Sequence, residues 1–328
     1  MKRVLLFSRD AGGANQMAGL HDVLTGVMPA PTPDLAGFAA SLGPVKVVAG
    51  GRDHAVAVWR RAGIEPAVWP DGRDGAAWLA ELGVDTVLTA TSDVDDDSPQ
   101  RLWQAARAAG LPCAAFIDHS ANLGERFRSR DGGVTYPDHV FAIDAAMAAG
   151  LEAQGVPRGR LRLGGDLHKA RLHRCGSRVS AEAAAALRLT WGVSPGAVVV
   201  LFPGEAQAEM CATGRIARYD EFACLEHVLA QAAEAGACVV IRPHPKDTPG
   251  KYDRYAAPPT VVVSTDGDSL HAVLAADVVA GMDSTLFVEA GALGRPAVSL
   301  WPRHPLHGPL NLPRRGEEQP FPAALTPA

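Results

Sequence analysis

The run 278–296 holds the most specific chemical pattern of the sequence. A short apolar segment is followed by Asp283, Ser284 and Thr285, and then by an apolar helical pattern. Unpaired backbone amides at the start of a helix, together with hydroxyl groups, form a site for anions. The pattern therefore predicts a phosphate-binding turn, while an ordinary helix cap accounts for Ser284 alone.

Glu289 lies about one helical turn further along, within the otherwise apolar stretch 286–293. A carboxylate in such surroundings needs a hydrogen-bonding or charged partner. The hydroxyl groups of a ribose can donate hydrogen bonds to it, so we predict that Glu289 binds a nucleoside. The alternative is an ordinary glutamate of the helix.

A basic loop follows the apolar run 237–242, with Arg242, His244 and Lys246 separated by two prolines. Proline fixes its φ angle, so this loop is stiff. Three groups that can carry positive charge suit a phosphate or a diphosphate. The alternative is a rigid turn whose charges face solvent.

A glycine-containing loop follows the first apolar run, 3–8, and includes Asp10, Gly12 and Gly13. Glycines let backbone amides approach a ligand closely, and the start of a helix favours an anion. The spacing is not the G-x-G-x-x-G pattern of dinucleotide-binding proteins. We interpret the loop as a ligand-binding turn, with a tight structural turn as the alternative.

Two neighbouring residues, Asp118 and His119, end the apolar run that begins at Cys113. A carboxylate beside an imidazole at the end of a strand is suited to proton transfer. Adjacent side chains of an extended chain point in opposite directions, so only one of the two needs to face a substrate. We therefore predict catalytic roles among Asp10, Asp118 and His119.

The acidic loop 91–98 and the five cysteines bear on metal binding. Carboxylates after a strand can hold a divalent cation, but acidic residues also stabilise the start of the following helix without one. The cysteines are widely spaced and form no zinc-binding pattern, and we expect Cys113 and Cys238 in the core. We predict no metal site.

Short apolar runs alternate with helical patterns along most of the chain. Because the runs are hydrophobic throughout, they favour a parallel sheet that is buried on both faces. The predicted helices are 15–24, 98–109, with Ser98 as the N-cap, 180–189 and 219–235. The predicted strands are 3–8, 45–50, 86–91, 113–118, 139–143 and 161–164, then 197–202, 237–242, 260–264, 278–280 and 297–300.

This alternation predicts an α/β protein with two Rossmann-like, doubly wound parallel-sheet domains that face each other across a cleft. The first domain is expected at 1–165 and the second at 196–302, joined by a polar and basic linker at 166–195. The tail, 303–328, is rich in proline and shows no strand or helix pattern, so we expect an extended wrap or a disordered end.

The composition excludes several classes of protein. Of the 328 residues, 47% are apolar and 20% are charged, which disfavours intrinsic disorder. The formal charge of −5 is spread along the chain, so no basic face for nucleic acid is expected. No apolar run is long enough to cross a bilayer, and no signal-peptide pattern is present. We expect a cytoplasmic protein.

The order of these motifs resembles the nucleotide-sugar-using GT-B superfamily of glycosyltransferases and UDP-GlcNAc 2-epimerases. It is most similar to the bacterial surface-polysaccharide and CDP-glycerol-polymerising branches. The matching pieces span residues 1 to about 301 and occupy predicted strand ends. They are Asp10-Ala-Gly-Gly, Phe116-Ile-Asp-His, Leu163-Gly-Gly-Asp, Arg242-Pro-His-Pro and Asp283-Ser-Thr…Glu289-Ala…Gly294-Arg-Pro.

The resemblance implies a donor nucleotide in the second domain. Ser284 and Thr285 would hold its diphosphate, Arg242 and Lys246 would offset the charge, and Glu289 would bind the ribose. The acceptor would lie near Gly12, Gly13 and His119 in the first domain. The family usually needs no bound metal, and the nucleotide sugar is a substrate, so no cofactor is implied.

Three functions stay open at this level. The first is a metal-independent glycosyltransferase that moves a sugar from a nucleotide diphosphate to an acceptor hydroxyl or amine, with Asp10 or His119 as the general base. The second is a nucleotide-sugar 2-epimerase or hydrolase that uses acidic residues near 93–97 and Asp118. The third is a binding module without activity. The sequence names neither sugar, base nor acceptor, and a homodimer is compatible with it.

Overall fold

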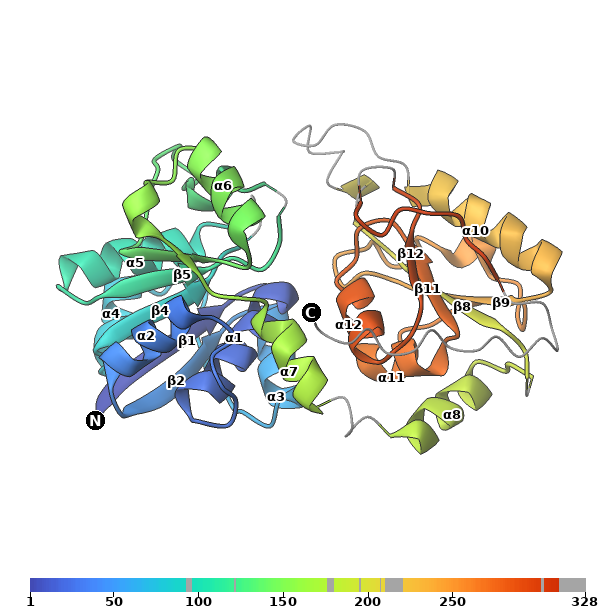
Figure 1. The fold of residues 1–328 in the computed structure, drawn as a ribbon, viewed down its shortest axis with the longest axis horizontal. Helices are drawn as coiled ribbons and strands as arrows, with labels where there is room; N and C mark the ends of the chain where they lie inside the picture. The colour runs from blue at the N-terminus through green and yellow to red at the C-terminus, as the bar shows by residue number, and fades with distance from the viewer. Residues whose placement is uncertain are drawn as a thin grey trace. The chain divides into compact units, whose positions relative to one another are not determined.

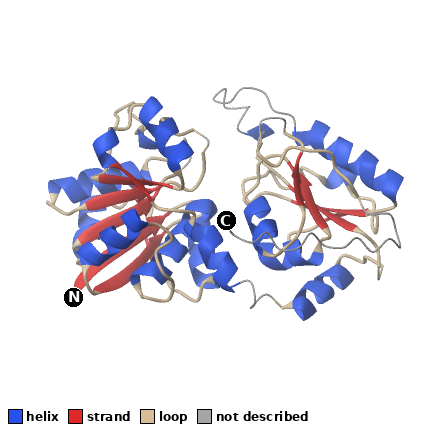
Figure 2. Ribbon diagram, in the orientation of Figure 1, coloured by secondary structure: helices blue, strands red, loops and turns tan. Residues whose placement is uncertain are grey.

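The structure is a computed structural model that describes residues 1–92, 96–120, 122–175, 180–194, 196–206, 208–209, 221–301 and 304–312. The chain divides into two compact units, Met1–Arg171 and Leu172–Ala328 (Figure 1). Each unit is a parallel sheet with helices around it (Figure 2). The predicted α/β class with two parallel sheets is confirmed.

The first unit contains a seven-stranded sheet in the order β3-β2-β1-β4-β5-β6-β7. All neighbouring strands are parallel. The order reverses between β1 and β4, which is the point where ligands bind in open sheets of this type. The strands are β1 (Lys2–Ser8), β2 (Val45–Gly51), β3 (Ala67–Val68), β4 (Thr86–Ala90), β5 (Cys113–Phe116), β6 (His139–Ala142) and β7 (Leu161–Leu163).

Helices cover both faces of this sheet. One apolar cluster includes Trp69, Trp78 and Trp103, and the cluster on the other face includes Met17 and Trp59. Strands that are buried on both faces explain the continuous hydrophobicity of their sequences. The helices are α1 (Ala11–Leu24), α2 (Pro33–Leu42), α3 (His54–Arg61), α4 (Gly75–Leu82), α5 (Ser98–Ala108), the 3₁₀ turn η1 (Glu125–Phe127), α6 (Ala145–Ala153) and η2 (Arg158–Arg160), and α7 (Leu167–Cys175) contains the boundary between the two units.

The second unit contains a five-stranded parallel sheet in the order β10-β9-β8-β11-β12, which reverses between β8 and β11. Apolar clusters again lie on both faces. The strands are β8 (Val199–Pro203), β9 (Cys238–Arg242), β10 (Val261–Val263), β11 (Val278–Gly281) and β12 (Ala297–Ser299). The helices are α8 (Ala181–Thr190), α10 (Glu221–Ala235), η4 (Asp253–Tyr255), α11 (Ser269–Ala275) and α12 (Leu286–Ala292).

Two local expectations are corrected, and one short strand was not predicted. Helix α1 begins at Ala11, before the predicted residue 15, so Gly12 and Gly13 lie in its first turn instead of in a loop. Their low helix propensity hid this start. The N-cap of α5 is Asp97 instead of Ser98. The two-residue strand β3 is too short to give a periodic pattern.

One residue of the predicted tail packs into the core of the second unit. Leu310 is buried and belongs to an apolar cluster of the second unit, while the tail beyond residue 312 lies outside the described residues.

None of the described helices combines the length and the apolar character that a membrane crossing requires.

Candidate functional site

The loops that follow β4 and β5 in the first unit are joined by a buried arginine. Arg126, on the turn η1, donates hydrogen bonds to the Asp118 carboxylate and to the Thr91 hydroxyl, each at 2.7 Å. Arg126 is 8% exposed, and a charge so buried needs partners of this kind. The sequence analysis missed Arg126, because no pattern of the sequence indicates its contacts with Asp118, eight residues away, and with Thr91, 35 residues away.

Asp118 also lies against the first turn of α1. A Cβ atom added to Gly12 would come within 2.6 Å of the Asp118 Oδ2 atom. Asp10 occupies the N-cap of α1 in extended conformation, but its side chain makes no cap hydrogen bond. The structure thus brings Asp118 to the glycine pair beside Asp10, and half-buried His119 follows next in the chain.

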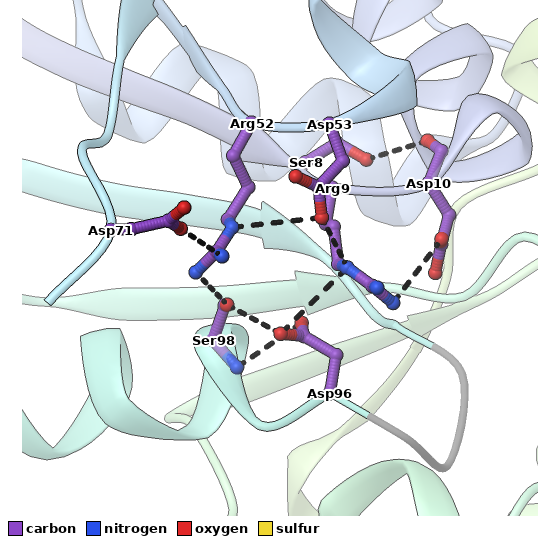
Figure 3. Close-up of polar contacts among 8 residues, drawn as sticks. All are labelled: Ser8, Arg9, Asp10, Arg52, Asp53, Asp71, Asp96 and Ser98. Atoms are coloured by element: carbon purple, nitrogen blue, oxygen red, sulfur yellow. Dashed lines mark hydrogen bonds and ion pairs between the residues drawn. The ribbon is translucent and has the colours of Figure 1, made fainter.

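A network of charged residues, which the sequence analysis did not identify, lies over the ends of β1 to β4 (Figure 3). The Arg9 Nε atom lies 2.7 Å from the Asp53 carboxylate and 3.9 Å from that of Asp96. Arg52 donates to Asp71 at 2.6 Å and to the Ser98 hydroxyl at 3.4 Å. Figure 3 shows both guanidinium groups between carboxylates, so the two positive charges are balanced within the network.

Asp53 has an unusual backbone conformation in this network. Its φ angle is +49° with ψ at −127°, a region that favours glycine, and it directly precedes α3. Such a conformation persists only where the surroundings hold it, and the ion pair with Arg9 does so here. A sequence signal existed, since the pair Arg52-Asp53 follows the predicted strand 45–50 after a single glycine.

Gly13 has no room for a side chain. A Cβ atom there would lie 2.6 Å from the Ala90 Cβ atom and 2.8 Å from the Ser8 Oγ atom. We expect Gly13→Ala to lower the free energy of unfolding by roughly 1–3 kcal/mol, as overpacking does, when measured by urea denaturation. Gly37→Ala is the control, because a Cβ at Gly37 in α2 meets nothing within 4 Å. Equal stability of the two variants would contradict this close packing.

In the second unit, the basic loop after β9 is closed by a hydrogen bond of its own. The backbone N–H of Lys246 donates to the Nδ1 atom of His244 at 3.0 Å. This hydrogen bond fixes the orientation of the imidazole ring within the loop.

Arg242 attaches β9 to the loop that follows β10. Its guanidinium group donates to the carbonyl oxygens of Asp266 and Gly267, each at 2.9 Å. Glu289, in α12, is 3% exposed and accepts a hydrogen bond from the Ser269 hydroxyl at 3.1 Å. Ser269 is thus one protein partner of this buried carboxylate. Arg242 and Glu289 are distant in sequence, but both contact the segment 266–269.

The predicted anion-binding turn after β11 is partly occupied by protein. The backbone N–H of Asp283 donates to the Glu205 carboxylate at 2.7 Å, and the Asp283 carboxylate lies 3.5 Å from the Nε2 atom of His304. The Ser284 hydroxyl accepts the Leu286 N–H at 3.2 Å, and exposed Thr285 is the N-cap of α12 without a side-chain cap bond.

A buried lysine gathers three carboxylates next to this region. The Lys251 ammonium lies 2.7 Å from Asp247, 2.7 Å from Glu209 and 2.8 Å from Glu221. It also donates to the carbonyl oxygen of Glu205 at 2.8 Å. Burial by itself would lower the pKa of Lys251, but the hydrogen bonds from its carboxylate partners outweigh this effect and raise the pKa above its ordinary value. The sequence analysis missed this cluster.

The sequence predicts that Cys113 lies in the core, and it predicts no metal site. Cys113 is buried, and burial is the main cause that raises the pKa of its thiol to about 11, so this thiol is unreactive. Among the described residues, no group of three or more His, Cys, Asp or Glu side chains is arranged to hold a metal ion. Asp93 and Asp95 of the acidic loop lie outside the described residues.

Comparisons with known proteins identify the fold of this chain. No protein-family model and no curated protein sequence matches the chain. Among solved structures, the UDP-GlcNAc 2-epimerase of Methanocaldococcus jannaschii is 11% identical with a TM-score of 0.59, over 92% of this chain and 84% of that one. The UDP-GlcNAc 2-epimerase of Neisseria meningitidis bound to UDP-GlcNAc is 13% identical with a TM-score of 0.56, over 92% and 82%.

A third similar structure is Anabaena HepE in complex with UDP-glucose. It is 14% identical with a TM-score of 0.57, and the match covers 91% of this chain and 80% of that one. These likenesses extend over both units of the chain. They show that it has the GT-B fold, as the motif order suggested.

Proposed function

We propose that this protein is an enzyme that uses a nucleotide sugar, specifically a glycosyltransferase that transfers the sugar to an acceptor hydroxyl or amine. One observation carries the proposal. Arg242 and Glu289, the residues predicted for the diphosphate and the ribose, both contact the short segment 266–269. The structures of N. meningitidis epimerase and of Anabaena HepE, which share the fold, were determined with nucleotide sugars.

The donor nucleotide is proposed to bind at the carboxyl edge of the five-stranded sheet. Ser284 and Thr285 supply hydroxyl groups at the start of α12, and His244 supplies an imidazole ring. Arg242 and Lys246 supply positive charge. Fixed donors and charges of this kind stabilise the negative charge that grows on a leaving diphosphate.

The acceptor is proposed to bind near the first turn of α1 in the first unit. Asp10 or His119 accepts the proton of the acceptor group while its oxygen or nitrogen forms a bond to the anomeric carbon. The bond from that carbon to the diphosphate oxygen breaks, and the nucleoside diphosphate leaves with the electron pair. The Asp118 carboxylate accepts a hydrogen bond from Arg126 at 2.7 Å, which holds it beside the glycine pair. We assign it a positioning role.

A nucleotide-sugar 2-epimerase or hydrolase is the second candidate. Its support is that two of the structures with this fold are UDP-GlcNAc 2-epimerases and that Asp118 lies beside the glycine pair next to Asp10. Incubation with a nucleotide sugar in the absence of an acceptor distinguishes the two. Rapid formation of an epimer or of free nucleotide favours the second candidate, and an intact donor favours a transferase.

The proposal is tested first by thermal unfolding with UDP, CDP, GDP, TDP and their sugars. A ligand that binds only the folded protein raises the midpoint of unfolding. We expect one nucleotide and its sugar to raise the midpoint well above the others. If none of them changes it, the nucleotide-binding proposal is wrong.

Glu289→Ala tests the ribose assignment. We expect this variant to bind the selected nucleotide more weakly by roughly 1–3 kcal/mol, the cost of losing a hydrogen bond to a charged group. Glu234→Ala, at an exposed position of α10, is the matched control and should bind like the parent protein. Glu289→Gln retains an oxygen that accepts from Ser269, so it separates loss of binding from loss of folding. Calorimetric titration that finds equal affinity for all variants contradicts the assignment.

A further inference from the structure

A cavity of about 380 Å³ lies beside α2 in the first unit, away from the switch point between β1 and β4. Helix α2 forms one side, and the outer strands β6 and β7 form the other. This volume lies at the small end of the roughly 300–1,000 Å³ range of ligand pockets. The lining residues are Pro33, Asp34, Gly37, Phe38, Ser41, His139, Phe141 and Arg162.

The cavity presents one positive and one negative group. The NH1 atom of Arg162 donates to the carbonyl oxygens of Gly159 and Leu161, while its NH2 and Nε atoms make no bond to the residues that the structure describes. The Oδ2 atom of Asp34 accepts the Leu163 N–H at 2.9 Å, and within the same described set its Oδ1 atom has no partner. Each charged group thus keeps hydrogen-bonding capacity for a ligand.

Apolar rings form the wall of the cavity. The Phe38 ring lies 5.0 Å from that of Phe141 and 5.8 Å from that of His139, measured between centroids. Burial, followed by the charge of Arg162, lowers the pKa of His139, so its ring is neutral at physiological pH. Its Nδ1 atom is buried and has no hydrogen-bond partner among the described residues.

We infer that this cavity binds a free α-amino acid with an aromatic or large apolar side chain. Arg162 pairs with the carboxylate, because guanidinium groups match its two oxygens. Asp34 pairs with the ammonium group, and the side chain packs against Phe38 and Phe141. A ligand with only one of the two charges leaves either Arg162 or Asp34 without its partner. This site is independent of the proposed transferase reaction.

The test is calorimetric titration of the full chain with L-phenylalanine, phenylacetate and phenethylamine. The last two compounds each lack one charge of the amino acid. We expect saturable binding of one L-phenylalanine per chain, and binding at least ten-fold weaker for each analogue. Absence of saturable binding, or equal binding of either analogue, overturns the inference.

Two variants locate the ligand. Gly37→Leu adds a large side chain at a glycine that lines the cavity, and a Cβ at Gly37 meets nothing within 4 Å. We expect it to lower the affinity for L-phenylalanine at least ten-fold. Gly291→Leu is the matched control, as Gly291 is an exposed helical glycine that is equally open. If Gly37→Leu binds L-phenylalanine as tightly as the parent protein does, the amino acid binds elsewhere and the inference is wrong.

Asp34→Asn tests the proposed pairing of Asp34 with the ammonium group of the amino acid. The asparagine oxygen still accepts the Leu163 N–H, so the fold is retained. We expect weaker binding of L-phenylalanine and unchanged or tighter binding of phenylacetate. A parallel loss for both compounds contradicts the pairing with an ammonium group.

Discussion

Removal of the general base is expected to lower kcat about 10²–10⁴-fold without changing the affinity for the nucleotide. Asp10 and His119 are the two candidates. One of the single variants, Asp10→Asn or His119→Gln, should show this loss, because proton transfer from the acceptor then depends on water. The measurement is release of nucleoside diphosphate from the donor that the thermal screen selects, with nucleotide affinity determined separately by titration.

Asp118 has a different place in the structure. Its carboxylate accepts a hydrogen bond from the Arg126 guanidinium at 2.7 Å, which fixes its position. Asp10 occupies the N-cap of α1, and its carboxylate lies 3.7 Å from the Arg9 guanidinium. Asp131→Asn is the matched control, since Asp131 is exposed and asparagine retains an acceptor for Gly133. If Asp10→Asn and His119→Gln both turn over donor like the control, neither residue is the base.

Replacement of Lys251 is expected to have the largest effect on stability. Lys251→Met leaves the carboxylates of Asp247 and Glu221, which are 2% and 1% exposed, without their common cation. Removing one partner of a buried ion pair costs about 3–5 kcal/mol, since the remaining charge is buried and uncompensated. Urea denaturation measures the loss.

Lys46→Met is the control for this experiment, because Lys46 is exposed on β2. An exposed substitution of this kind changes the free energy of unfolding by no more than about 0.5 kcal/mol. If Lys251→Met is as stable as Lys46→Met, the carboxylates are not held by Lys251.

The cluster also predicts how stability depends on pH. Hydrogen bonds to carboxylates raise the pKa of Lys251 in the folded protein against the effect of burial. A group with a raised folded pKa stabilises the fold fully below its unfolded pKa, here about 10.4, and this contribution is lost as the pH rises through the folded value. The difference in stability between the parent and Lys251→Met should therefore persist at neutral pH and shrink only in strongly alkaline solution.

The sequence determined the architecture because that information is local. Continuous apolar runs marked most strands to within one or two residues, and residues such as Arg242 and Glu289 stood out at strand ends or inside an apolar helix. A strand of a parallel sheet is buried on both faces, so its hydrophobicity alone reveals it. The order of these motifs was enough to indicate the GT-B fold.

Only the tertiary structure decided which charges meet. Arg126 joins Asp118 to Thr91, which follows another strand, Lys251 gathers three acidic residues, and Ser269 in α11 donates to Glu289 in α12. The Nδ1 atom of His244 accepts from a backbone amide of its own loop. A hydrogen bond or an ion pair requires its two atoms within about 3–4 Å, and no periodicity of the sequence encodes that separation.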